Sequence, residues 1–138
     1  MTLQLAQKAM DKAKIRLMER NDTLFYTSVF FSLKQVWDDT QPTACTDGRQ
    51  ILFNTEFFLK CTPDQQLGLI LHETEHVAFQ HMVRLGGRDP EKWNVAADHV
   101  INLGLTDRGF QLPPGGLCDR QYRGLSTEQV YELLPDTP

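Results

Sequence analysis

The chain has 138 residues and a formal net charge of −4, which suits one domain with its own hydrophobic core. No cluster of basic residues resembles a nucleic-acid binding surface. The charged first 20 residues lack the apolar core of a secretory signal. No apolar run approaches the about 20 residues that cross a bilayer. The three cysteines are odd in number without a C-x-x-C pair, which argues against a disulfide framework and favours a reducing, cytoplasmic compartment.

The first half of the chain predicts one helix and a small β-sheet. Apolar residues three or four apart indicate an amphipathic helix over 3–20. The stretch 24–37 is rich in Phe, Tyr and Val, so we expect mainly strand there. Asp47-Gly48 then predicts the turn of a hairpin between 43–46 and 50–53. Residues 54–60 are expected to connect the hairpin to the next helix, with one short helical turn.

The second half predicts three helices. Thr62 and Gln65 form a capping-box pattern that opens a helix, apolar on most sides, which we expect to end at Gly86-Gly87. Asp89-Pro90 opens a second helix that should end near Gly104, followed by a loop over 106–124. Ser126 caps a short last helix through Leu134. The fold class is α+β: a small antiparallel sheet packed on a central helix, in one domain over 1–138.

The central helix carries His72-Glu73-Thr74-Glu75-His76, an H-E-x-x-H pattern. Histidines at i and i+4 lie about 40° apart around a helix, so both can reach one ion. Glu73 could then accept a proton from a water that the ion activates. Burying these groups among apolar residues is costly without partners. The pattern favours one Zn²⁺ held by His72 and His76, against the alternative of two histidines on a wet helix face.

A catalytic zinc needs a third protein ligand, and Asp98 on the following helix is our candidate. Ala96 and Ala97 are small enough to let the two helices approach closely. Asn94 and Asn102 share the face of Asp98, so either could hydrogen-bond a ligand from outside. The alternative is a solvated polar stripe.

Other residues are weaker candidates. His81 competes for the third position, but it would lie on the opposite side if the helix continued, and 77–80 contain no glycine to turn the chain. We therefore expect His81 to contact the second helix or the surface. His99 could polarise a substrate carbonyl or simply pack, Tyr122 could donate to an oxyanion, and Glu75 should face solvent or form a salt bridge.

Long motifs resemble the family described as the putative metallopeptidase domain of bacteria and their phages, which in longer members precedes a von Willebrand factor A-like domain. The resemblance rests on residues 42–49, 53–54, 71–81, 84, 93–98, 109–113, 116, 119, 122–126 and 130–131. It implies a zincin-like fold and a zinc peptidase. It supports His72 and His76 as ligands and Glu73 as base, and it places Asp98 in the second motif.

Two features differ from that family. His99 stands where a tyrosine is expected after the aspartate, and the chain stops at Pro138 without room for the A-type domain. We therefore expect a free-standing version, which would work in the bacterial cytoplasm if it is phage-borne.

The leading hypothesis is peptide-bond hydrolysis, with an extended peptide or protein substrate. The substrate would pair with an edge strand, either Thr43, Ala44, Cys45 and Thr46 or residues 50–53. The alternative is a zinc-stabilised binding module without turnover, acting as an adaptor or inhibitor, in which His81 or another side chain fills the fourth zinc position. DNA-linked proteolysis is disfavoured by the acidic charge and the lack of a cysteine zinc ribbon. The sequence leaves the oligomeric state open.

Overall fold

The computed structural model describes residues 1–136 and contains, over these residues, α-helices and one small sheet. The strands are β1 (Lys34–Trp37), β2 (Ala44–Thr46) and β3 (Gln50–Phe53). The helices are α1 (Thr2–Met18), α2 (Leu24–Ser32), α3 (Thr55–Lys60), α4 (Pro63–Ala78), α5 (His81–Arg84), α6 (Pro90–Asp107), the 3-10 turn η1 (Arg120–Tyr122) and α7 (Thr127–Leu133). The predicted α+β class is confirmed.

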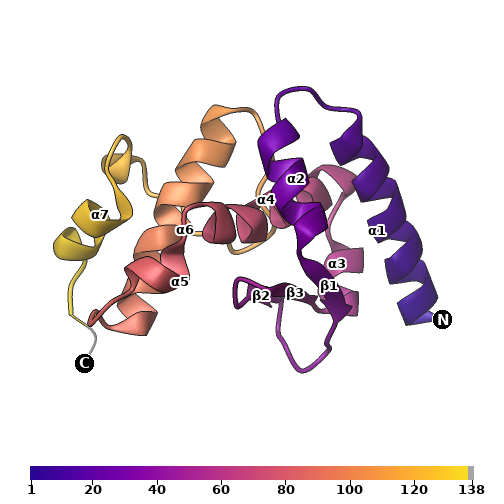
Figure 1. Ribbon diagram of the computed structural model, residues 1–138, viewed down its shortest axis with the longest axis horizontal. Coiled ribbons are helices and arrows are strands. Elements are labelled where there is room, and N and C mark those ends of the chain that lie inside the picture. The colour runs from indigo at the N-terminus through magenta and orange to yellow at the C-terminus, as the bar shows by residue number, and fades with distance from the viewer. Residues whose placement is uncertain (137–138) are drawn as a thin grey trace.

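Helix α4 lies at the centre of the molecule. Its start is fixed locally, because the Thr62 hydroxyl accepts from the Gln65 amide and the Gln65 side chain accepts from Thr62, as the capping box predicted. Figure 1 shows α1, α2 and α3 on one side of α4, with α6 and α7 on the other. Leu69, Ile70 and Leu71 join one core with residues from both sides. Apolar side chains all round α4 therefore reflect its burial.

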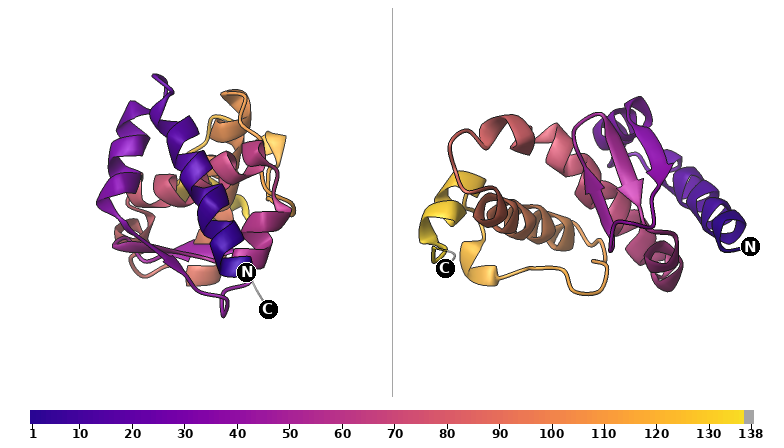
Figure 2. Two further views of the ribbon diagram at one scale, coloured as in Figure 1. Left: turned by 90° about the vertical axis from the view of Figure 1, so that its right-hand side faces the viewer. Right: turned by 90° about the horizontal axis from the view of Figure 1, so that it is seen from below.

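The sheet is mixed, with the strand order β1-β3-β2. β2 and β3 form the predicted antiparallel hairpin, whereas β1 runs parallel to β3, so the sheet is not antiparallel throughout. Along β3, Ile51 and Phe53 are buried, as the two-residue period of a strand requires. Because β3 is the central strand, residues 50–53 cannot be the edge strand that the sequence offered as one of two choices. The other choice, β2, is at an edge of the sheet. Viewed from below, the sheet lies between α1 on one side and α6 and α7 on the other (Figure 2).

The strand predicted over 24–37 is wrong for its first part, which forms α2. Aromatic and β-branched residues suggested a strand, but tertiary packing overrides such propensities. Tyr26, Val29, Phe30 and Leu33 pack on the core at i, i+3, i+4 and i+7, a helical spacing that the strand interpretation overlooked. Only Lys34–Trp37 is strand.

Two helix ends also differ from the prediction. Helix α4 ends at Ala78 rather than at Gly86-Gly87, because Gln80 adopts the left-handed conformation at φ 56° and turns the chain into α5. Helix α6 continues through Gly104 to Asp107 instead of ending at the glycine. It ends where the Arg108 amide donates to the Gly104 and Leu105 carbonyls of the last turn. A glycine within a helix costs only about 1 kcal/mol relative to alanine, which the packing of α6 overrides.

The segment after α6 crosses very close to α4 at Gly68. A Cβ atom at this position would lie 1.9 Å from the Gln111 carbonyl oxygen. The missing side chain therefore lets the loop that follows α6 lie directly on the central helix, and the same loop supplies one wall of the cavity described below.

Gly68→Ala should destabilise the protein by about 1–3 kcal/mol, because the methyl group must displace backbone. Gly104→Ala is the matched control, since it is also within a helix and its nearest contact would be a flexible Arg108 nitrogen at 3.9 Å. The control should be neutral or stabilising by up to about 1 kcal/mol. Urea unfolding of both variants measures the difference. Equal stabilities would mean that the close approach at Gly68 does not constrain the fold.

Candidate metal centre

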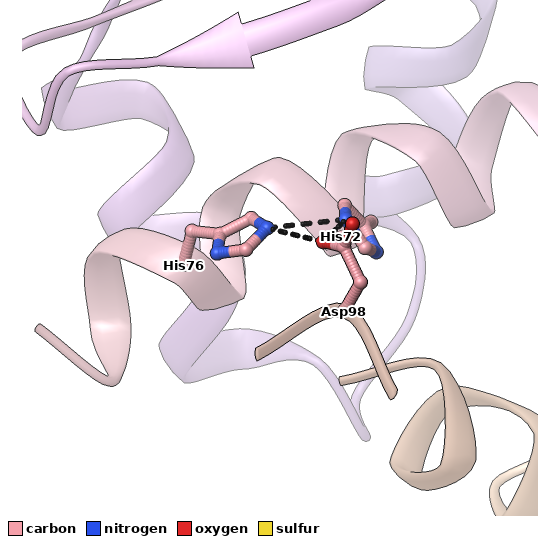
Figure 3. A group of neighbouring side chains, drawn as sticks. All are labelled: His72, His76 and Asp98. Atoms are coloured by element: carbon pink, nitrogen blue, oxygen red, sulfur yellow. Dashed lines mark hydrogen bonds and ion pairs between the residues drawn. The ribbon is translucent and has the colours of Figure 1, made fainter. Parts of the chain in front are cut away.

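Three side chains from α4 and α6 converge on one point (Figure 3). One oxygen of Asp98 lies 3.0 Å from Nε2 of His72 and 3.0 Å from Nε2 of His76. The two Nε2 atoms are 3.2 Å apart. The structure thus brings together the three residues that the sequence suggested as metal ligands.

Helix α6 meets α4 through the face that carries Asp98. Ile101 and Leu105 follow Asp98 at i+3 and i+7, and both join the core cluster that contains Ile70 and Leu71 of α4. The two small residues before Asp98 do not fill this contact as expected, because Ala96 packs with Val130 of α7 and Ala97 lines the cavity of the site. The apolar face of α6 therefore brings the carboxylate to the histidines of α4.

The outer nitrogens of the two histidines each have a partner. Nδ1 of His72 lies 2.8 Å from Oδ1 of Asn102, whose own Nδ2 donates to the Leu117 carbonyl at 2.8 Å. That second bond orients the amide, so His72 donates through Nδ1. Nδ1 of His76 lies 3.2 Å from Nδ1 of His81. When each ring is neutral and carries its proton on Nδ1, both Nε2 lone pairs face the Asp98 oxygen, which is the state that metal binding requires.

This arrangement fits a metal ion. Two nitrogen lone pairs and a carboxylate within about 3 Å of one another repel unless a cation or a proton lies among them. Ligand atoms about 2.0–2.1 Å from a tetrahedral zinc are about 3.3 Å apart, close to the separations found here. His72, His76 and Asp98 could therefore hold a metal with little rearrangement.

Protonation competes with the metal at this point. Burial lowers the pKa of His72, but its hydrogen bond with Asp98 and the nearby Glu73 carboxylate outweigh burial and raise that pKa to about 9. Burial raises the pKa of Asp98, but hydrogen bonds to both histidines lower it well below its usual range. The electrostatic preference for positive charge among the three groups is the same one that a metal cation would satisfy.

Glu73 lies beside the three candidate ligands. Its Oε2 is 4.0 Å from Nε2 of His72, and its side chain is 8% exposed. Burial raises the pKa of this carboxyl, and the neighbouring histidines lower it. A buried carboxylate at this position can accept a proton from a group next to the metal position without being a ligand itself.

The site opens into a cavity of about 540 Å³. One wall is strand β2 with Thr43, and the opposite wall is formed by α5 and α6. The loop 113–117 supplies a third wall. Among the described residues no lysine or arginine lines it; the lining includes Thr43, Ala44, Cys45, Thr46, Glu73, Met82, Leu85, Trp93, Asn94, Asp98 and Leu117. The shape suits an extended, uncharged stretch of a ligand.

The predicted contact of His81 with the second helix is confirmed, because its carbonyl accepts from the indole of Trp93 on α6, but its predicted place on the opposite side of α4 is wrong. The helix does not continue, because the left-handed turn at Gln80 brings His81 back onto His76. His81 is 3% exposed, and burial together with His76 and Arg84 lowers its pKa to about 3. It is thus a neutral residue that contacts His76, one of the three candidate metal ligands. Sequence reasoning missed this because a glutamine gives no signal of a left-handed turn.

His99 and Tyr122 do not reach the cavity. Their rings pack on each other at 5.0 Å, and Nδ1 of His99 accepts from the Asp119 amide. In the described part of the chain neither residue lines the cavity. The geometry gives no support to their suggested roles in catalysis.

Asn102, Asn94 and Glu75 lie in three different surroundings. Asn102 bonds His72, whereas Asn94 is exposed and lines the cavity one turn before Asp98. Glu75 is buried and paired with Arg108 at 2.8 Å, which agrees with the predicted salt bridge and not with a solvent-facing position. Burial raises the pKa of Glu75. This pair ties α4 to the end of α6.

Residues 6–137 match the protein family described as "putative metallopeptidase domain". The chain therefore belongs to that family, which agrees with the resemblance seen in its motifs. No curated protein and no solved structure matches the chain. Within residues 1–136, no helix is long and apolar enough to cross a membrane.

Asn102→Leu should weaken zinc binding by about 10- to 100-fold, because His72 loses the acceptor that orients its ring. Asn94→Leu is the matched control and should change the zinc affinity little. A competition titration with a chromophoric chelator measures both constants. If the two variants bind zinc equally well, Asn102 does not orient the ligand.

Proposed function

We propose that this chain is a zinc-dependent peptidase in which His72, His76 and Asp98 hold one Zn²⁺ and Glu73 is the general base. The observation that carries the proposal is the convergence of two histidine nitrogens and a carboxylate beside a buried glutamate, inside a cavity bordered by an edge strand. The family description supports the same activity.

The ligand set favours a catalytic zinc over a structural one. Structural sites use four protein ligands, often cysteines, whereas catalytic sites use three with one open position. The three cysteines are free thiols, and His81, the candidate for a fourth ligand, lies against the far nitrogen of His76. This arrangement supports an enzyme rather than the alternative of a silent binding module.

The chemistry divides between the metal and Glu73. When bound, zinc acts as a Lewis acid and lowers the pKa of a water molecule towards about 7. Glu73 accepts a proton from the attacking water and later delivers it to the leaving amine. The raised pKa of its buried carboxyl suits both steps, since a carboxyl that is too acidic would return the proton poorly. Asn102 holds the His72 ring in place during these steps.

The substrate would pair with the edge of the sheet. Thr43 and Asp47 form the outer hydrogen bonds of the hairpin, with Asn54 and Gln50 respectively. Bonding alternates along an antiparallel pair, so Cys45 bonds β3 while the backbone groups of Ala44 and Thr46 point away from it. Both residues line the cavity. An extended peptide that adds to β2 would therefore lie alongside Glu73 and the metal ligands.

Glu73→Gln should retain zinc and lose about 10²- to 10⁴-fold in kcat, because the amide cannot accept the proton. Turnover of a library of internally quenched peptides and the zinc content of the same samples test this. Glu75→Gln is a control for removing a buried carboxylate from the same helix. Full turnover by the Glu73 variant would exclude it as the base.

Ala44→Pro should lower kcat/KM by about 3- to 10-fold, mainly through KM, because one outward N–H that pairs with substrate is lost. Proline is tolerated on an edge strand where the N–H faces outward. Cys45→Pro removes an inward bond and should instead destabilise the hairpin. Peptide kinetics and thermal unfolding distinguish the two effects. Unchanged kinetics in a folded Ala44→Pro protein would exclude pairing at this position.

A further inference from the structure

We infer that His81 and Thr127 form a hydrogen-bonded relay through which helix α7 positions the metal ligand His76. The inference rests on the proposed metal site and adds two positioning residues to it, neither of which touches the metal. Nε2 of His81 lies 3.1 Å from the Thr127 hydroxyl oxygen, and Nδ1 of His81 lies 3.2 Å from Nδ1 of His76. Figure 1 shows α5, α6 and α7 together at one end of the molecule.

The direction of each hydrogen bond follows from metal binding. A metal at Nε2 of His76 leaves the proton of that neutral ring on Nδ1, so Nδ1 donates to His81. His81 must then be bare at Nδ1 and carry its own proton on Nε2. That second N–H is buried and needs an acceptor, which the Thr127 oxygen provides. Only this pattern satisfies all three groups while His76 binds a metal.

The opposite pattern prevents metal binding. If His81 carried its proton on Nδ1, it would donate to Nδ1 of His76, whose own proton would move to Nε2 and block the metal position. His72 is different, because its partner is an amide oxygen that can only accept. The His76 side of the site therefore depends on a ring with two tautomers, and the acceptor on α7 favours the one that permits binding.

The surroundings hold both relay residues in place. Thr127 is 2% exposed and is the first residue of α7, directly after the N-cap residue Ser126. The His81 carbonyl accepts from the indole of Trp93, and rings of Phe79 and Trp93 contact its imidazole edge to face. Arg84 pairs with Glu128, which attaches α5 to α7 independently of the relay.

Thr127→Val and Thr127→Ser test the relay in the full chain. Valine has nearly the shape of threonine but lacks the acceptor, so zinc affinity should fall by about 3- to 10-fold. Serine restores the oxygen and should restore the affinity. His81→Phe keeps an aromatic ring but removes the acceptor for His76, and it should cost about 10- to 100-fold. Zinc affinity is measured by chelator competition, and ¹⁵N NMR of the imidazoles reports which nitrogens carry protons.

Glu128→Gln is the control, because it breaks the other attachment of α7 and should leave zinc affinity unchanged. NMR of the zinc-loaded wild type should show His81 protonated at Nε2 and His76 at Nδ1. The relay is overturned if folded Thr127→Val binds zinc as tightly as wild type, or if Glu128→Gln weakens binding as much. A wild type that binds no zinc would instead overturn the proposed function, and the relay with it. If the wild type binds zinc and Thr127→Val binds it with the same affinity, the relay alone is overturned and the proposed function stands.

Discussion

Asp98 shares one carboxylate oxygen between two histidines of a neighbouring helix, and the architecture is arranged around that contact. Two bare imidazole nitrogens and an anionic oxygen cannot remain about 3 Å apart in a largely buried place without positive charge among them. The fold keeps them there by packing α4 in the centre and bringing α6 against it through Ile101 and Leu105, on the same face of α6 as Asp98. The supporting contacts to Asn102 and His81 leave these nitrogens free to face the same point.

The chain turn at Gln80 is the second constraint. A non-glycine residue in the left-handed region costs about 1–2 kcal/mol relative to the usual helical conformation. In return, the turn ends α4 two residues after His76 and places His81 against Nδ1 of that proposed ligand. Arg84 stabilises it by donating to the Phe79 carbonyl while pairing with Glu128. Backbone strain, ligand orientation and the docking of α7 are thus linked at one corner of the site.

Local signals in the sequence predicted much of this structure. The capping boxes at Thr62 and Ser126 act within four residues, so they identify the starts of α4 and α7 without tertiary information. The i, i+4 spacing of His72 and His76, and the small residues before Asp98, were enough to suggest the three ligands. Non-local features were not accessible in this way. The parallel pairing of β1 with β3 and the turn at Gln80 depend on contacts that no short motif encodes. The aromatic composition of α2 concealed a helical spacing that was present.

The account is tested most directly by the zinc content of the purified, reconstituted protein, measured by elemental analysis beside His76→Ala and Asp98→Ala. We predict about one zinc per wild-type chain and loss of the metal in both variants. Any remaining zinc affinity should fall by more than the about 10- to 100-fold expected when a residue that only orients a ligand is replaced. A wild-type protein without zinc, or variants that retain a full equivalent, would contradict the metal centre and the peptidase activity proposed from it.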